Sequence, residues 1–195
     1  MPRDPESRQP QIQGEARVES SKRLYTGKVL NLDIDRVRFP NGSIGELEMI
    51  RHPGASAIIP FVGDPSERDP AILLIKQYRY AAKGFLYEIP AGRLNPGEDP
   101  LNCAQRELKE ETGCSARNID YLFTMFTTPG FTDERIHVFA ATRLSPGDTE
   151  HEPDEFMTAE TMTLSHAVEL IRIGGISDAK TALALLYASS FRGRI

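Results

Sequence analysis

The RELKEE stretch at residues 106–111 places three carboxylates within five residues of one predicted helix. Asp99 followed by Pro100 marks the start of that helix, and Gly113 marks its end. Like charges four residues apart repel, and the negative end of the helix dipole disfavours acids in the second half. The stretch is therefore either a solvated face, whose acids pair with neighbouring basic residues, or a site that holds something positive.

Helical geometry places these carboxylates beside the buried face. The apolar stripe of the predicted helix, residues 101–112, runs through Leu101, Ala104 and Leu108. At 100° per residue, Glu111 lies about 60° from Leu108, Glu107 about 100° and Glu110 about 160°. Glu107 and Glu111 are four residues apart, so their carboxylates can converge on one point. A divalent cation at that point would turn their repulsion into attraction.

The segment before the helix contains two glycines that suit a ligand site. Gly92 follows a predicted strand that ends in EIPA, and Gly97 precedes Glu98 at the start of the helix. Glycine lets backbone carbonyl groups approach a ligand closely. Hard cations such as Mg²⁺ take oxygen ligands, so a few carboxylates and one backbone carbonyl would form a suitable site.

Composition narrows the class of protein and partner. The 195 residues include 23 Lys plus Arg and 28 Asp plus Glu, which gives a net charge of −5. We find no basic run interleaved with aromatic residues, so we expect small-molecule partners and no nucleic acid. Cys103 and Cys114 have neither disulfide-framework nor metal-knuckle spacing. Short apolar runs and reduced thiols predict a cytoplasmic protein with no membrane segment.

The order of predicted elements indicates an α+β fold. Alternating apolar residues on both sides of the PNGS turn, residues 40–43, predict antiparallel strands between residues 24 and 50. Further strands are predicted near 57–62, 71–77, 85–92, 119–127 and 136–142 and from 156 onward, and two helices at the C-terminal end. This order predicts an α/β/α sandwich, with a mixed β-sheet between helices, plus an N-terminal antiparallel β piece.

The spacing around the charged helix resembles the signature of Nudix hydrolases. Gly92, five residues, Glu98, seven residues and then RELKEETG match every polar and glycine position of that signature, and Cys114 stands where the family usually has an aliphatic residue. The resemblance extends over most of residues 24–190. It implies N-terminal strands at 18–52 and a Nudix hydrolase domain at 53–195. Residues 1–17 are rich in Pro, Gln, Arg and Glu with almost no aromatic or β-branched content, which predicts a disordered tail.

The resemblance also implies a metal-dependent reaction on a nucleoside diphosphate linked to another group. Glu107, Glu110 and Glu111 and the carbonyl of Ala91 would hold Mg²⁺, or alternatively Mn²⁺. Glu111 would thereby take part directly in catalysis. Arg106 belongs to the predicted catalytic set too, where it would orient the loop and the glutamates together with Glu98.

A second motif, TTPGFTDE at residues 127–134, resembles the binding loop of the ADP-ribose pyrophosphatase branch of the family. The expected reaction is hydrolysis of ADP-ribose to AMP and ribose 5-phosphate, and the expected assembly is a homodimer with exchanged N-terminal strands. The predicted substrate-binding residues are Arg51, Arg79, Glu88, Pro129 and Phe131. Another nucleoside diphosphate sugar, such as a GDP- or UDP-hexose, and non-catalytic binding of ADP-ribose by a regulator are the alternatives.

The general base is expected on the acidic loop that precedes the strand from residue 156. Glu155 aligns best with the position of the family's loop glutamate, and Glu152 is the second candidate. A mobile loop suits this role, because it can close over bound substrate and exclude water.

Overall fold

The computed structural model describes residues 14–149 and 156–191, which form two compact units. The smaller unit contains residues 14–52 together with the later segment 128–133. The larger unit contains residues 53–127, 134–149 and 156–191. The chain therefore passes from the larger unit to the smaller one and back around residues 128–133.

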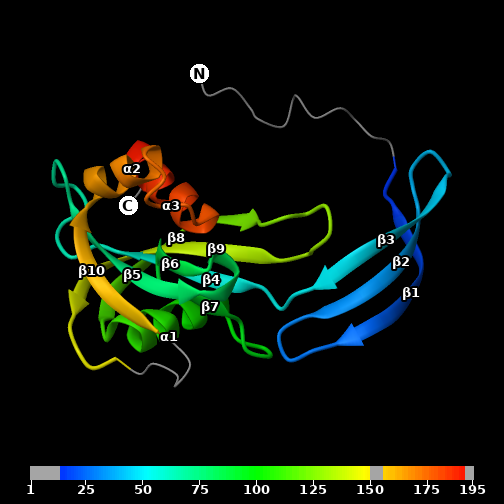
Figure 1. Cartoon of the computed structure of the whole chain (residues 1–195), viewed down its shortest axis with the longest axis horizontal. Coiled ribbons are helices and arrows are strands. Elements are labelled where there is room, and N and C mark those ends of the chain that lie inside the picture. Colours follow the sequence, from blue (N-terminus) through cyan, green and yellow to red (C-terminus); the bar gives the residue numbers. More distant parts are fainter. Residues whose placement is uncertain (1–13, 150–155, 192–195) are drawn as a thin grey trace. The chain divides into compact units, whose positions relative to one another are not determined.

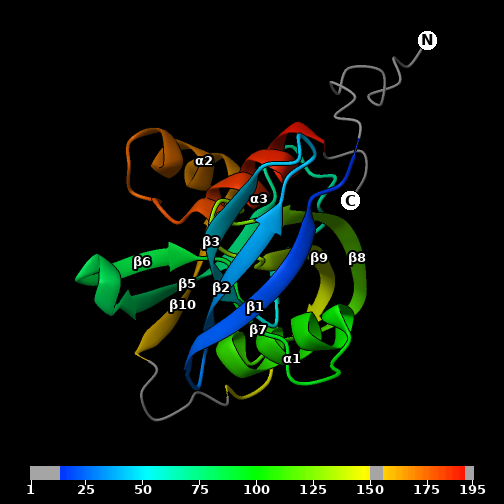
Figure 2. The same ribbon diagram turned by 90° about the vertical axis from the view of Figure 1, so that its right-hand side faces the viewer.

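Three antiparallel strands form the sheet of the small unit: β1 (Arg17–Thr26), β2 (Asn31–Arg38) and β3 (Ile44–Arg51). They lie side by side in the order β1-β2-β3 (Figure 2). The predicted PNGS turn joins β2 to β3, with Gly42 at a φ of 84° and the side chain of Asn41 accepting a hydrogen bond from the backbone N–H of Ser43 at 2.9 Å. Glycine suits this turn because it adopts positive φ without strain.

The buried positions of β2 are largely acidic. Asp33, Asp35 and Val37 alternate along the strand and are buried, and Val37 is the only buried apolar residue within 14–52 and 128–133. Asp33 accepts hydrogen bonds from the guanidinium groups of Arg23 and Arg51. Ion pairs therefore occupy positions that a hydrophobic core would normally fill.

Two sheets form the framework of the large unit. Strand β5 (Ala71–Arg79) pairs antiparallel with both β6 (Gly84–Glu88) and β10 (Met157–Thr163). The second sheet has the order β7-β4-β9-β8 and contains β4 (Ala55–Pro60), β7 (Ala91–Arg93), β8 (Ser115–Phe126) and β9 (Arg135–Ser145). It is mixed, because β4 and β9 run parallel while its other pairs are antiparallel.

Alternate side chains of β4 face different cores. Ala57 and Ile59 pack in a cluster that includes residues of α2 (Leu164–Arg172) and α3 (Ala179–Ser190). Ile58 packs with Ala104 and Leu108 of helix α1 (Pro100–Thr112). Helix α1 thus covers one side of the strands and α2 with α3 covers the other (Figure 1). The predicted α/β/α sandwich is confirmed.

The predicted helix after Asp99 is also confirmed, with one correction to its buried face. The Asp99 carboxylate accepts a hydrogen bond from the backbone N–H of Leu101 at 2.9 Å, and Gly113 ends the helix at a φ of 71°. Leu101 is exposed rather than buried, and Cys103 takes a place in the interior instead. No helix within the described residues is long and apolar enough to cross a membrane.

Candidate active site

Helix α1 turns two of its glutamates toward the interior. Glu107 and Glu111 are only 8% and 4% exposed, although they are charged and lie in the second half of the helix. The side chain of Glu110 is 34% exposed. The order of burial is the one that the 100° spacing predicts, with the three carboxylates fanning out from the edge of the core.

The buried glutamates lie against strand β7. A Cβ atom added at Gly92 would be 1.8 Å from Oε1 of Glu107, so only glycine leaves room for this carboxylate beside the backbone. The neighbouring peptide group of Ala91 donates a hydrogen bond from its N–H to Oε2 of Glu111 at 3.0 Å. Two carboxylates of α1 therefore lie against the short strand whose Ala91 carbonyl the sequence predicts as a metal ligand.

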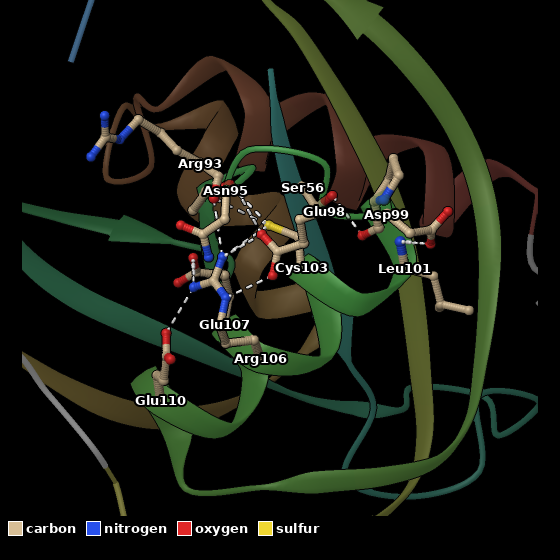
Figure 3. Close-up of polar contacts among 12 residues, drawn as sticks. Ser56, Arg93, Asn95, Glu98, Asp99, Leu101, Cys103, Arg106, Glu107 and Glu110 are labelled. Atoms are coloured by element: carbon tan, nitrogen blue, oxygen red, sulfur yellow. Dashed lines mark hydrogen bonds and ion pairs between the residues drawn. The ribbon is translucent and has the colours of Figure 1, made fainter. Parts of the chain in front are cut away.

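Arg106 connects three carboxylates of this region, those of Glu98, Glu107 and Glu110 (Figure 3). Its Nε and Nη2 donate to the two oxygens of Glu98 at 2.9 and 3.0 Å, and Nη1 donates to Glu107 at 2.5 Å and to Glu110 at 2.9 Å. Nη2 also donates to the carbonyl of Arg93 at 3.0 Å. One side chain thus joins the helix to the loop that precedes it.

The ion pair between Arg106 and Glu98 shifts both pKa values. The hydrogen bond from Arg106 lowers the pKa of Glu98 to about 2, and the same bond raises the pKa of Arg106 above its ordinary value. Both groups are therefore charged at neutral pH. Glu98 also accepts a hydrogen bond from the backbone N–H of Asn95 at 2.8 Å, so the pair fixes the loop as well as the helix.

A second cluster of charges lies on strands β5 and β6. Arg79 donates to both oxygens of Glu88, from Nε at 2.7 Å and from Nη2 at 2.9 Å, which is the paired geometry that a guanidinium forms with a carboxylate. Glu88 is 2% exposed, whereas the side chain of Arg79 is 42% exposed. Burial would raise the pKa of Glu88, but Arg79 and Lys180 outweigh it and lower that pKa.

The predicted substrate loop adds a short stretch to the N-terminal sheet. The backbone N–H of Ile50 donates to the carbonyl of Phe131 at 2.8 Å, and the N–H of Asp133 donates to the carbonyl of Ile50 at 3.3 Å. Thr132 thereby forms an isolated parallel bridge with Ile50. The side chain of Phe131 stays exposed on this loop. Substrate roles for Phe131 and Pro129 stay predictions.

Arg51 holds the same loop through its side chain. Its Nη1 donates to Asp133 at 3.3 Å, its Nε donates to Asp33 at 3.2 Å, and its Nη2 contacts Asp35. Asp133 also accepts a hydrogen bond from the backbone N–H of His52 at 2.9 Å. The predicted substrate role of Arg51 stays a prediction, and a substrate phosphate would compete with these ion pairs.

The two candidates for the general base, Glu155 and Glu152, lie outside the described residues. The sequence also leaves two structural contributors unrecognised. Asp133 contacts β3 across more than 80 positions of the chain, which no local pattern reveals. Lys180 contacts Glu88, and the only local signal near it is the Asp178 cap of helix α3.

Comparison with known proteins places this arrangement in a family. The NUDIX domain model matches residues 51–183, a range that contains the glutamates of α1, the Gly92 strand and the Arg79 cluster. The chain belongs to the Nudix family. It is a Nudix pyrophosphohydrolase, as the helix motif predicts.

Two relatives match most of this Nudix chain. An ADP-ribose pyrophosphatase of Bacillus subtilis (strain 168) is 37% identical over 175 residues, which cover 89% of the chain and 92% of the relative. A methanol dehydrogenase activator of Bacillus methanolicus has the same identity and coverage. A solved structure of an ADP compounds hydrolase has a TM-score of 0.77 at 20% identity, covers 93% of this chain and 98% of its own, and shows a shared fold.

Divalent metal ions are the general cofactors of Nudix hydrolases. Within residues 14–149 and 156–191, no three acidic, histidine or cysteine side chains surround a common point. The donor set nevertheless fits a hard cation, because Gly92 leaves space for the Glu107 carboxylate and Glu111 lies at the peptide of Ala91. Glu107 and Glu110 direct oxygens at Arg106, whose single charge does not balance both.

Proposed function

We propose that this Nudix hydrolase cleaves the pyrophosphate bond of ADP-ribose to give AMP and ribose 5-phosphate, with Mg²⁺ as the cofactor. The observation that carries the proposal is the pair of buried glutamates packed on strand β7, since a Nudix site that binds cations for phosphate chemistry needs oxygen donors there. The relative from Bacillus subtilis, similar over nearly the whole chain, supports the choice of ADP-ribose. Mn²⁺ would suit the same oxygen ligands.

The residues of the chain divide this work among them. Glu107, Glu110, Glu111 and the Ala91 carbonyl would hold the cation, which when bound supplies positive charge to the phosphate oxygens and makes a water molecule more acidic. Arg106 fixes the position of the loop relative to the helix through its hydrogen bonds to Glu98 and to the carbonyl of Arg93.

Arg79 is the proposed ligand of the substrate's phosphates. Glu88 holds its Nε and Nη2, and no hydrogen bond from its third nitrogen, Nη1, is found within residues 14–149 and 156–191. A guanidinium oriented in this way loses little conformational freedom when it binds a phosphate oxygen. Glu88 therefore acts on the substrate through Arg79 in this proposal. Glu155, or alternatively Glu152, would take the proton from the attacking water.

A substrate panel tests the proposed reaction. ADP-ribose, GDP-mannose, UDP-glucose, diadenosine polyphosphates and dNTPs are incubated with Mg²⁺, with Mn²⁺ and with a chelator, and the phosphorylated products are measured. We expect the highest kcat/KM for ADP-ribose and no turnover with chelator. A preference for a GDP- or UDP-hexose would refute ADP-ribose as the preferred substrate. Turnover that survives chelation would refute the metal-dependent mechanism.

We also propose that the protein is a cytoplasmic homodimer in which the N-terminal sheet packs against a second copy. A three-stranded sheet with one buried apolar residue, Val37, buries too little surface to be stable alone. All ten residues of β1 are exposed, among them Val18 and Tyr25. Light scattering during size-exclusion chromatography should give the mass of two chains, and a monomer at micromolar concentration would refute the dimer.

A further inference from the structure

The first turn of helix α3 is hydrogen-bonded to the backbone that leads into strand β7. The Asp178 carboxylate caps the helix by accepting hydrogen bonds from the backbone N–H of Thr181 at 2.9 Å and from the hydroxyl of Thr181 at 2.6 Å. The same hydroxyl oxygen accepts a hydrogen bond from the backbone N–H of Ile89 at 2.9 Å. Thr181 is fully buried, so this contact fixes the chain two residues before Ala91.

Lys180 makes a second contact from this turn, to the residue before Ile89. Its Nζ donates to Oε2 of Glu88 and, at 3.0 Å, to Oδ2 of Asp178. The side chain of Lys180 is only 12% exposed. The buried carboxylate of Glu88 therefore has two cationic partners, the partly exposed Arg79 from strand β5 and the largely buried Lys180 from helix α3.

The balance of charges gives Lys180 a role beyond packing. Arg79 and Lys180 carry two positive charges, and Glu88 and Asp178 carry two negative ones. Without Lys180 the buried carboxylate of Glu88 would take its compensation from Arg79 alone. The positive charge that Arg79 presents to an anionic ligand would then be smaller, and the ion pair would hold the guanidinium closer to Glu88.

The cluster lies within electrostatic reach of the catalytic helix. The hydrogen bond that Arg79 donates to Glu88 is the main cause of the raised pKa of Arg79, and the charge of Glu111 adds to it. Arg79 is thus the member of the cluster that combines a partly exposed side chain, a nitrogen without a hydrogen-bond partner in the described part of the chain, and an electrostatic interaction with Glu111.

We propose that Lys180 is a positioning residue for substrate binding. It neutralises part of the negative charge of Glu88 and thereby leaves Arg79 oriented and available to the substrate's diphosphate. This inference rests on the proposed function, because it assigns Arg79 to the phosphates. Lys180 itself touches no reacting atom in this account.

The test removes the charge of Lys180 while it keeps a hydrogen-bond donor. Lys180→Gln should raise KM about tenfold, with a much smaller change in kcat. A tenfold change in affinity corresponds to the loss of about one charge-assisted hydrogen bond to phosphate. Lys180→Arg keeps the charge and should restore most of the affinity. Lys76→Gln is the matched control, since Lys76 lies on β5 with an exposed side chain 4.0 Å from Glu160 and should leave KM unchanged.

A double-mutant cycle separates positioning from general stability. In a Glu88→Gln background there is no buried carboxylate for Lys180 to neutralise, so Lys180→Gln should cost little further affinity there. A purely structural role would lower the thermal midpoint in both backgrounds and leave KM unchanged in both. Circular dichroism melts of the four proteins identify that outcome.

The assay uses the panel substrate with the highest kcat/KM, because every panel member carries a phosphoanhydride. If that substrate is not ADP-ribose, the proposed function fails while the Lys180 test proceeds unchanged. If none is turned over, the dissociation constant for ADP-ribose from calorimetry replaces KM. An unchanged KM or dissociation constant in Lys180→Gln, or an equal loss in both backgrounds, overturns the inference.

Discussion

Gly92→Ala should reduce catalysis strongly without unfolding the protein, because the added methyl group collides with one side chain. The new Cβ would lie 1.8 Å from Oε1 and 2.0 Å from Cδ of Glu107. To reach 3.0 Å, the shortest distance that real Cβ contacts show, the carboxylate must retreat by about 1.2 Å. A displacement of about 1 Å in a catalytic group costs about 100-fold in rate, or about 2.7 kcal/mol of transition-state stabilisation.

The assay is steady-state release of AMP from ADP-ribose with Mg²⁺. We expect kcat/KM of Gly92→Ala to fall about 100-fold or more. The far-UV circular dichroism spectrum should be unchanged, since Glu107 lies at the edge of the core and α1 keeps both of its caps. Loss of secondary structure would instead show that the glycine serves the fold.

Two comparisons make the result specific to the collision. Gly84→Ala is the matched control, because a Cβ there would have no neighbour closer than 3.9 Å and should leave activity unchanged. In a Glu107→Gln background, Gly92→Ala should cost little more, since the carboxylate it displaces is already absent. Activity of Gly92→Ala close to that of the wild type, or a full additional loss in the Glu107→Gln background, would refute the argument.

Three further changes test the rest of the site. Glu111→Gln should lower kcat by about 1000-fold or more with the fold intact, if this carboxylate holds the metal, and near wild-type turnover would contradict that role. Asp133→Asn weakens the ion pair with Arg51 and should raise KM with a smaller effect on kcat. An unchanged KM would show that the contact between Asp133 and Arg51 does not contribute to substrate binding. Glu98 has its pKa lowered from 4.5 to about 2, so its contribution to stability is present above about pH 4.5 and is lost as pH falls toward 2. The urea midpoint of Glu98→Gln should therefore depend less on pH across that window than the wild-type midpoint, and an identical dependence would contradict the ion pair.

Local signals in the sequence predict helix α1 and its glutamates well. Asp99 and Gly113 bound the helix as expected, because capping depends on residues next to each other in the chain. The graded burial of Glu111, Glu107 and Glu110 follows from helical periodicity alone. The mixed sheet between helices likewise follows from the order of the elements.

Contacts between distant segments could not be predicted in the same way. Apolar alternation in β2 suggests that Leu32 and Ile34 face the core, yet the buried positions are Asp33 and Asp35, whose partners Arg23 and Arg51 come from the two neighbouring strands. The alternating apolar pattern begins only at residue 24, whereas β1 begins at Arg17, because the residues of β1 are all exposed and carry no such pattern. Charge pairing, and not hydrophobicity, sets the pattern of this sheet.

The attachment of Phe131 and Asp133 to strand β3 constrains how the chain can be assembled and divided. During synthesis the N-terminal strands emerge first, but the edge of β3 cannot form these contacts until a segment more than 80 residues downstream has been synthesised. Formation of this sheet edge is therefore coupled to completion of β8, which ends just before that segment. For the same reason a fragment cut after His52 would lack part of its own unit, so an exchange of the N-terminal piece between relatives must include residues 128–133 to keep the unit whole.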